Sequence, residues 1–205
     1  MLLYLIRGQQ KEMKELTKKE IADALRSLAA EKSLSAISIK DITERAGVNR
    51  QTFYYHFRDI IGLLEWICLE DEKRLLEGRN TFDNWQKSFL SIFHEIRKDR
   101  VFIMNVYRSA PPELLMTHLY SIVYQIIYTV VDEKARNYDV SEDDKKFITD
   151  FFKYSFVAIV LEWIKGGMED CPERIVGHLS ILLEGTVDRS LENFSRSNRC
   201  GVHPD

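Results

Sequence analysis

Apolar residues recur every three to four positions along most of this chain, and this period predicts an all-α protein of about nine helices. The first helix is expected to begin at Thr17, because Glu20 follows at the spacing of a capping box. Ile21, Leu25 and Leu28 then lie on one helical face. The other helices are expected from residue 38, from residue 49, and over residues 59–77, 83–99, 101–109, 112–138, 141–165 and 172–194.

Two of these helices, between Ser38 and Phe57, are short and are separated by a glycine-containing turn. Gly47 is placed to take the left-handed backbone conformation that ends the first helix. Asn49 is a good N-cap for the second helix, and Phe53 and Phe57 form its inner pair. This is the pattern of a helix-turn-helix, whose second helix enters the major groove of DNA.

The polar residues of the second helix have the chemistry for that groove. Arg50 can donate two hydrogen bonds to guanine, and Gln51 can pair with adenine. Two tyrosines, Tyr54 and Tyr55, fall on the outward side. Contacts to phosphate or to the groove are expected from Thr52, Tyr54, His56 and, from the preceding helix, Lys40. The alternative is an ordinary helical hairpin with a solvated outer face.

The charge distribution is uneven along the chain. Residues 17–58 hold eight Lys and Arg against five Asp and Glu, a charge of +3, which leaves −6 for the rest because the whole chain carries −3. A basic front segment on an acidic remainder suits a protein that presents one end to phosphate. Ordinary variation of surface charge would give the same numbers.

Catalytic, metal and membrane motifs are missing from the sequence. The cysteines Cys68, Cys171 and Cys200 are odd in number and widely spaced, which favours reduced thiols in a cytoplasmic protein and predicts no metal site. There is no P-loop, nucleophile elbow, HExxH or dinucleotide fingerprint, so neither catalysis nor a cofactor is expected. The apolar residues 1–6 are too few for a membrane span or a signal peptide.

The segment Ala46-Gly47-Val48, followed by Phe53-Tyr54-Tyr55-His56-Phe57, resembles the TetR/AcrR family of bacterial transcriptional regulators. The resemblance implies that Arg50, Gln51 and Tyr55 face bases. It further implies that phosphates are held by Lys40, Thr52, Tyr54 and His56. Many members have a lysine shortly after the His-Phe pair, whereas this chain has Arg58-Asp59, so Arg58 is the candidate substitute.

The resemblance implies a domain layout as well. A helix-turn-helix domain is expected over residues 14–60, with the helix 59–77 as connector, and a regulatory and dimerisation domain over 78–195. The break is expected at Glu77–Asn80, and residues 1–13 and 196–205 are expected to be disordered or an extension. Residues 49–57 with Glu65-Trp66 also resemble one subgroup, which includes regulators of dihydroxyacetone kinase operons.

A homodimer follows from this reading, because two copies of the motif are needed for a palindromic DNA operator. In the family, the last two helices form a four-helix interface. The residues expected there are Phe152, Phe156, Ile159, Val160, Trp163, Leu179, Leu182, Leu183 and Thr186. For each of them, a place in the internal core is the alternative.

An effector site is the remaining expectation. Tyr120, Tyr124 and Tyr128 recur every four residues and form an aromatic stripe, near which Trp85, Phe89 and Tyr107 could lie. Such a stripe can line a ligand cavity, or it can be core with its hydroxyls at the surface. The sequence therefore predicts a dimeric regulator controlled by a small-molecule or protein effector. The alternative is an interaction protein of the same fold that acts through a protein co-effector.

Overall fold

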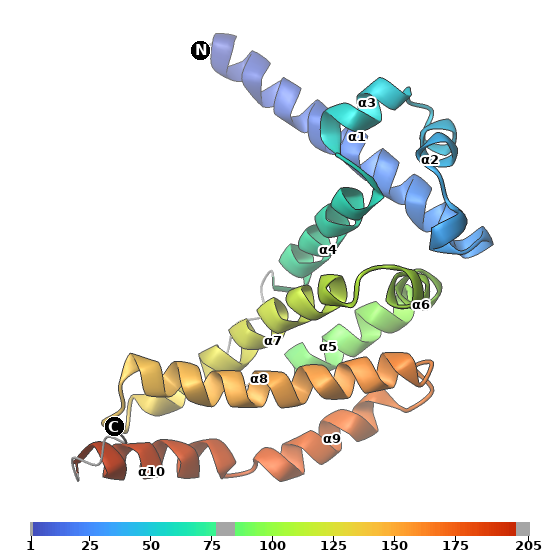
Figure 1. Ribbon diagram of the computed structural model, residues 1–205. Helices are drawn as coiled ribbons and strands as arrows, with labels where there is room; N and C mark the ends of the chain where they lie inside the picture. Colours follow the sequence, from blue (N-terminus) through green and yellow to red (C-terminus); the bar gives the residue numbers. More distant parts are fainter. Residues whose placement is uncertain (1, 77–84, 200–205) are drawn as a thin grey trace. The chain divides into compact units, whose positions relative to one another are not determined.

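The computed structural model describes residues 2–76 and 85–199, and all regular structure in these ranges is helical. The predicted all-α class is confirmed, with ten α-helices and one short 3₁₀ helix in the described ranges. The first five elements are α1 Leu2–Glu31, η1 Leu34–Ala36, α2 Ile39–Ala46, α3 Arg50–His56 and α4 Ile60–Leu76 (Figure 1). The rest are α5 Trp85–Lys98, α6 Arg100–Ser109, α7 Pro112–Ala135, α8 Glu142–Lys165, α9 Pro172–Leu183 and α10 Thr186–Arg199.

The helices form two compact units. The first unit comprises the residues up to Glu70 together with Val101–Leu114, and the second comprises Asp71–Arg100 and the residues from Leu115 onward. The first unit thus contains most of α6, although its position in the sequence had placed that helix in the C-terminal domain. The expected domain break at Glu77–Asn80 lies outside the described residues.

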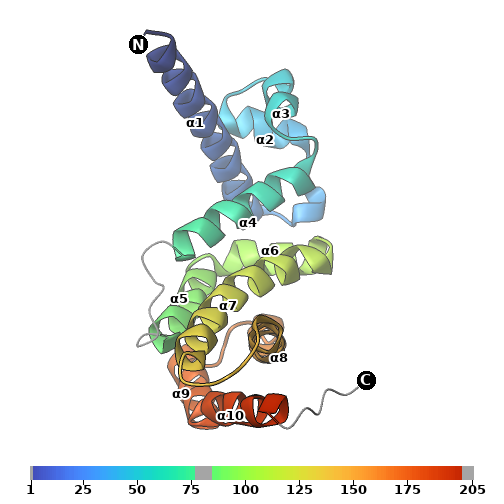
Figure 2. The ribbon, with the colours of Figure 1, turned by 90° about the vertical axis from the view of Figure 1, so that its left-hand side faces the viewer.

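The first unit is built around α1, with α2 and α3 packed beside it (Figure 2). Ile21 and Leu25 of α1, Ile42 of α2, Phe53 of α3 and Leu63 of α4 are all fully buried. Each comes from the apolar face of its helix, so the amphipathic pattern of the front segment becomes one shared core.

Two ion pairs attach α2 to the end of α1. The Lys32 ammonium lies 2.9 Å from the carboxylate of Asp41, and Arg45 donates to both carboxylate oxygens of Glu31 at 2.8 and 2.9 Å. Asp41 also completes a capping box with Ser38 at the start of α2. The hydrogen bonds from Lys32 and from the Ser38 backbone hold the pKa of Asp41 well below its usual range.

The side chain of Asn105 in α6 binds backbone groups at the end of α1. Its amide nitrogen donates to the carbonyls of Ala29 at 2.8 Å and Lys32 at 3.0 Å, and its oxygen accepts the Leu34 N–H at 2.9 Å. The last carbonyls of a helix have no partner within that helix. Asn105 supplies partners from a segment more than 70 residues away in sequence.

The second unit has an aromatic core between α5 and α8. The rings of Phe89 and Phe156 lie 4.5 Å apart between centroids, and those of Phe93 and Trp163 lie 4.9 Å apart. These edge-to-face contacts add to the stabilisation from buried area. Among the described helices, α7 alone is long and apolar enough to cross a membrane, and half of its most apolar stretch is buried, as in a core helix.

Two expected helix ends differ in the structure. The start at Thr17 is wrong, because α1 already begins at Leu2 and the Thr17 hydroxyl donates to the Met13 carbonyl inside the helix at 3.0 Å. The expected helix 172–194 is divided into α9 and α10. Gly185 lies at this division with a φ of +69°, which interrupts the helix although the apolar spacing continues through it.

Replacing Asn105 by alanine should lower the free energy of unfolding by about 2 kcal/mol, because three hydrogen bonds are lost and partly buried backbone groups lose their partners. Urea unfolding followed by circular dichroism measures this change. Asn198→Ala is the matched control, since Asn198 makes one exposed hydrogen bond to Asp144, and its effect should stay below about 0.5 kcal/mol. Equal effects of the two substitutions would contradict the role of Asn105.

Candidate nucleic-acid interface

The turn between α2 and α3 has the predicted geometry. Gly47 has φ 67° and ψ 25°, a left-handed conformation, and the Val48 N–H donates to the Thr43 carbonyl at 3.0 Å. Asn49 caps α3 by accepting the Thr52 N–H at 2.8 Å. Both predictions, the glycine turn and the asparagine cap, are confirmed. Together they fix where α3 begins and in which direction it leaves the turn.

The inner face of α3 is held by the two predicted phenylalanines. Phe53 is fully buried, Phe57 is 5% exposed, and their ring centroids lie 5.8 Å apart. Trp66 of α4 lies edge-on to Phe57, with 5.9 Å between the centroids. With both rings fixed inside, α3 has one possible rotation about its axis.

The outer face of α3 carries the predicted polar and aromatic residues. Tyr54 is 57% exposed and Tyr55 is 63% exposed, while Arg50 and Gln51 are exposed at the first turn. Among the described residues, no side chain binds the guanidinium of Arg50. The donors of this face are therefore available to a ligand outside the chain.

The exposed end of α3 lies next to two lysines of α1. The Lys14 ammonium is 5.2 Å from the centre of the Tyr55 ring, and Lys18 is 5.7 Å from that of Trp66. Partial burial, reinforced by the charges of Lys18 and Lys14, lowers the pKa of His56. The lowered pKa favours the neutral His56 ring, which has one N–H to donate. Lys14 was missed from sequence because the first helix was expected to start only at Thr17.

The remaining candidates flank α3. Lys40 is exposed and lies 3.7 Å from Glu44 of its own helix. Thr52 is half-buried, and its hydroxyl donates to the Asn49 side chain at 3.1 Å. Arg58 is almost fully exposed, but its Nε donates to Asp59 at 2.9 Å, and Asp59 also accepts the Gly62 N–H as cap of α4. Arg58, the cation after the His-Phe pair, is thus held by an ion pair with the residue that caps α4.

The six effector candidates are divided between the two units. Trp85 and Phe89 both contact Phe156 in the second unit, where Phe89 is fully buried. Tyr107 belongs to the first unit. Among the described residues, no cluster of three His, Cys, Asp or Glu side chains is placed to hold a metal ion.

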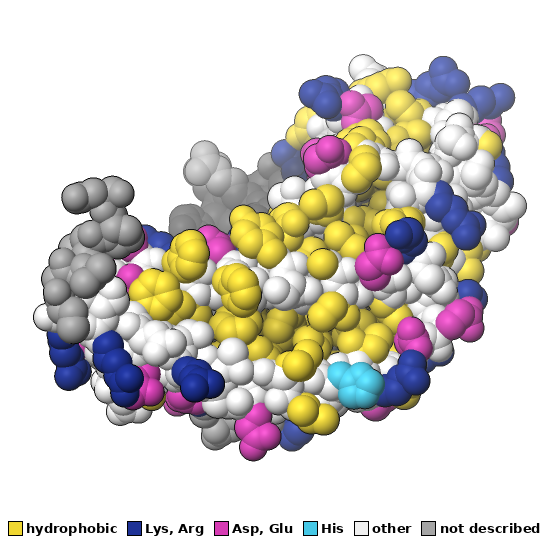
Figure 3. Space-filling view, turned by 60° about the horizontal axis from the view of Figure 1, so that its bottom comes forward, with side chains coloured by type: hydrophobic (Ala, Val, Ile, Leu, Met, Phe, Trp, Pro, Cys, Tyr) yellow, Lys and Arg dark blue, Asp and Glu magenta, His cyan; other side chains and the backbone are white. Residues whose placement is uncertain are grey.

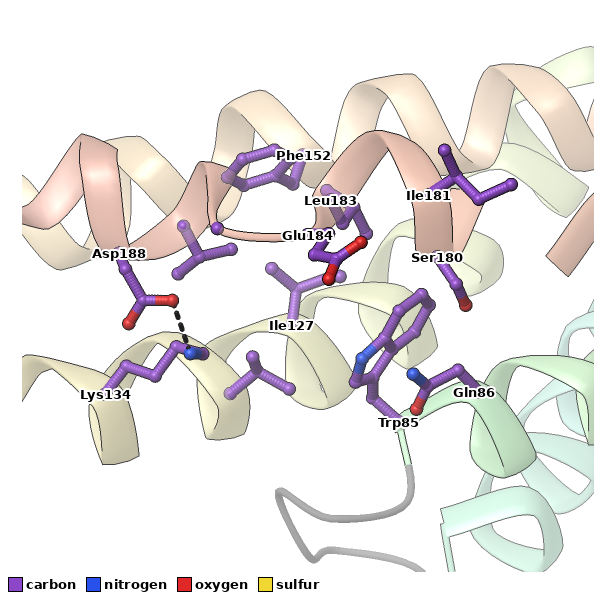
Figure 4. Close-up of a pocket in the computed structure, with 13 residues that line it drawn as sticks. Trp85, Gln86, Ile127, Lys134, Phe152, Ser180, Ile181, Leu183, Glu184 and Asp188 are labelled. Atoms are coloured by element: carbon purple, nitrogen blue, oxygen red, sulfur yellow. Dashed lines mark hydrogen bonds and ion pairs between the residues drawn. The ribbon is translucent and has the colours of Figure 1, made fainter. Parts of the chain in front are cut away.

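The tyrosine stripe of α7 makes contacts within itself and with α8. Tyr120 meets Tyr154 edge-on, Tyr124 stacks on Tyr128, and the Tyr128 hydroxyl donates to Glu142 at 2.9 Å. The pocket in Figure 4 is lined by Trp85 but by none of these three tyrosines. All three tyrosines are half-buried.

The nine dimer candidates differ in exposure. Five of them are buried within their own unit in a single chain, namely Phe152, Phe156, Val160, Trp163 and Leu179. Ile159, Leu183 and Thr186 are half-buried, and Leu182 is 72% exposed. The exposed apolar residues of α8 and α9 are Phe147, Phe151, Tyr154, Ile181 and Leu182, and Figure 3 shows hydrophobic side chains gathered over these helices. The five buried residues fit the internal-core alternative, since their area is already covered.

Comparison with protein families agrees with the geometry of α2 and α3. Residues 21–67 match a family model described as "Bacterial regulatory proteins, tetR family". Residues 83–185 match a second one, "Transcriptional regulator C-terminal region" of the TetR type. These matches define a transcriptional regulator with a DNA-binding front segment. The chain belongs to the TetR family.

Individual relatives support the finer resemblance. The chain is 27% identical over 155 residues to the HTH-type dhaKLM operon transcriptional activator DhaS of Lactococcus lactis subsp. lactis (strain IL1403), covering 74% of this chain and 81% of DhaS. A solved structure titled "Dihydroxyacetone kinase operon activator DhaS" matches with a TM-score of 0.68 and 24% identity, over 84% of this chain and 96% of that chain.

A TetR regulator from Streptococcus agalactiae 2603V also shares the fold, with a TM-score of 0.60 and 22% identity over 86% of this chain and 98% of that one. The predicted family and the predicted DhaS-like subgroup are confirmed. Two curated relatives that match are described as a transcriptional activator and a transcriptional regulator.

Phe53→Ala should destabilise the protein by about 3–5 kcal/mol, because it removes a fully buried ring. Tyr54→Ala, the neighbouring aromatic residue on the exposed side, should cost less than about 1 kcal/mol. Urea unfolding of the two variants beside the wild type measures the difference. A Tyr54 variant as unstable as the Phe53 variant would show that α3 is rotated differently.

Proposed function

We propose that this protein is a cytoplasmic, homodimeric transcriptional regulator that binds a palindromic DNA operator and is controlled by an effector acting on the second unit. One observation carries the proposal: α3 exposes Arg50, Gln51, Tyr54 and Tyr55 while buried phenylalanines fix its rotation. Exposed aromatic side chains beside a guanidinium that has no partner among the described residues suit a groove that offers base edges and phosphates.

The residues of α3 divide into two roles. Arg50 at the first turn donates to guanine, Gln51 pairs with adenine, and Tyr55 completes the base contacts. Thr52, Tyr54 and His56 bind phosphate oxygens and hold the register. His56 does so through the single N–H of a neutral ring, in keeping with its lowered pKa.

Two cations beside α3 add to phosphate binding. Lys40 is exposed at the start of α2, and the carboxylate of Glu44 lies 3.7 Å away on the same exposed surface. Such a pair is weak in water, so Lys40 can turn to phosphate at little cost. Arg58 donates its Nε hydrogen to Asp59, and its two terminal nitrogens can donate to DNA phosphates.

Two copies of the chain are required for a palindromic operator. We place the contact between them on the outward faces of α8 and α9, where Phe151, Ile181 and Leu182 are each more than 60% exposed. Ile159, Leu183 and Thr186 flank this surface as half-buried residues. An apolar surface of this kind is typical of a partner interface, and a second copy satisfies the symmetry of the operator.

Effector control follows from a two-state dimer. An effector bound to the second unit favours one spacing of the two α3 helices, and only one spacing matches the operator. Coupling between effector and DNA is then reciprocal, and about 1–3 kcal/mol of it changes affinity roughly 5- to 150-fold.

A second candidate is an interaction protein of the same fold, acting through a protein co-effector with weak DNA binding of its own. The ion pair between Arg58 and Asp59 favours it, because the cation that follows the His-Phe pair is partly neutralised. The experiment on the operator separates the two candidates.

Arg50→Ala should reduce the preference for the operator over unrelated DNA by about tenfold, because it removes a bidentate base contact. His56→Ala should instead weaken binding to all sequences alike, because it removes a phosphate contact. Fluorescence anisotropy with the DNA upstream of the gene and with scrambled DNA, over a series of salt concentrations, measures both effects.

Arg136→Ala is the control for this experiment, because it makes the same charge change at an exposed position of the second unit. It should leave both affinities unchanged. A wild-type protein that shows neither a steep salt dependence nor a preferred site would rule out the DNA-binding function and favour the interaction protein.

Leu182→Glu should convert the dimer into monomers at micromolar concentration, because a charge would be buried in the apolar contact between copies. Size-exclusion chromatography with light scattering measures the mass. Val101→Glu is the control, since Val101 is a similarly exposed apolar residue of the first unit, and this variant should remain dimeric. A monomeric wild type would remove the proposed interface.

A further inference from the structure

The second unit contains a pocket of about 440 Å³ at the junction between α9 and α10 (Figure 4). The start of α5 provides Trp85, the second half of α7 provides Ile127 and Val130, and α8 provides Phe152. The end of α9 closes the pocket with Leu183 and the residues that follow it. A volume of this size is in the range of small-molecule sites.

The walls of this pocket are mainly apolar. An indole ring and a phenyl ring, from Trp85 and Phe152, stand with the aliphatic side chains of Ile127, Val130 and Leu183. Flat or branched hydrocarbon groups bury their surface favourably against such walls. The body of a suitable ligand is therefore apolar.

The charged groups of the pocket leave one carboxylate uncompensated. Lys134 and Asp188 form an ion pair with 2.6 Å between Nζ and Oδ2. Glu184 also lines the pocket, and among the described residues no side chain or backbone group binds its carboxylate. The lining thus carries two acids and one base, and its net charge is −1.

This arrangement discriminates between ligands by charge. An anionic ligand would be repelled by Glu184 and would have to separate Lys134 from Asp188. A cationic group gains an ion pair with Glu184, and the face of the Trp85 indole, on the α5 side of the pocket, attracts cations too. A neutral ligand gains neither contact.

We propose that this pocket binds an amphipathic organic cation, with an apolar ring or branched chain against Trp85 and Phe152 and an ammonium group at Glu184. The proposal deepens the proposed function, because it gives the chemical class of the effector and its place. Binding itself requires neither DNA nor a second copy of the chain.

The position of Glu184 connects the pocket to the surface proposed for the dimer. Glu184 is the C-cap residue directly after α9, and Gly185 follows with its left-handed backbone. Leu182, only two residues before Glu184, is exposed on the proposed contact surface, and Ile181 both lines the pocket and is 72% exposed. A cation held at Glu184 therefore acts on the same helical turn that presents Leu182 to the second copy.

The test uses the full chain and three probes that share a phenylbutyl group: phenylbutylamine, which is cationic, phenylbutanol, which is neutral, and phenylpentanoate, which is anionic. Calorimetry and the fluorescence of Trp85, isolated by comparison with Trp85→Phe, report binding. The amine should bind saturably and about fivefold more tightly than the alcohol, and the carboxylate should bind least.

Glu184→Gln should reduce the affinity for the amine to that for the alcohol and leave the alcohol unchanged. Because the Glu184 side chain is exposed and without a partner among the described residues, this variant should fold normally. Glu133→Gln makes the same charge change at an exposed position of α7 that does not line the pocket, and it should bind the amine as the wild type does. Ser180→Phe, which fills the pocket, should abolish binding of all three probes.

The proposal is overturned if no probe binds saturably, or if Glu184→Gln binds the amine as tightly as the wild type does. Operator binding of the same preparations, measured without any probe, separates this failure from that of the proposed function. Intact operator binding without amine binding would remove the pocket assignment alone. Amine binding without operator binding would remove the DNA-binding function and leave the pocket.

Discussion

Burial of Phe53 and Phe57 is the constraint on which the candidate site depends. A helix of seven residues such as α3 has little stability of its own, because the cost of its first turn is shared among few hydrogen bonds. Its conformation comes from two rings inserted into the core formed by α1, α2 and α4. Since these rings allow one rotation of the helix, they also decide that Tyr54 and Tyr55 are exposed. The chemistry of the outer face is therefore a consequence of the packing of the inner one.

Most of the first unit could be predicted from sequence because it is specified by local patterns. Gly47, Asn49 and the pair Phe53 and Phe57 each act within four residues of the turn that they stabilise, and a single sequence contains all the information for them. The family resemblance rests on the same residues. The class of fold and the exposed face of α3 were predictable for this reason.

The features that could not be predicted from sequence depend on the three-dimensional surroundings of a residue and not on its local pattern. Thr17 has the spacing of a helix cap, yet its hydroxyl bonds backward to Met13 in a helix that is already formed. The division between α9 and α10 at Gly185 leaves the apolar spacing undisturbed, so periodicity does not reveal it. The apolar residues of α8 and α9 share one helical spacing, and only burial within a single chain distinguishes Phe152 and Phe156 of α8 from the exposed Leu182 of α9. Asn105 gives no indication in sequence of the carbonyls that it binds.

The contact made by Asn105 affects which gene segments could recombine without disrupting the first unit. The chain passes between its two units three times, after Glu70, after Arg100 and after Leu114. A gene fragment that ends at α4 would encode the groove-reading helices without the segment that binds the last carbonyls of α1. Recombination between related genes would thus preserve the front unit only if two separate stretches of coding sequence moved together. The two units are consequently less modular in this chain than the linear order of its motifs suggests.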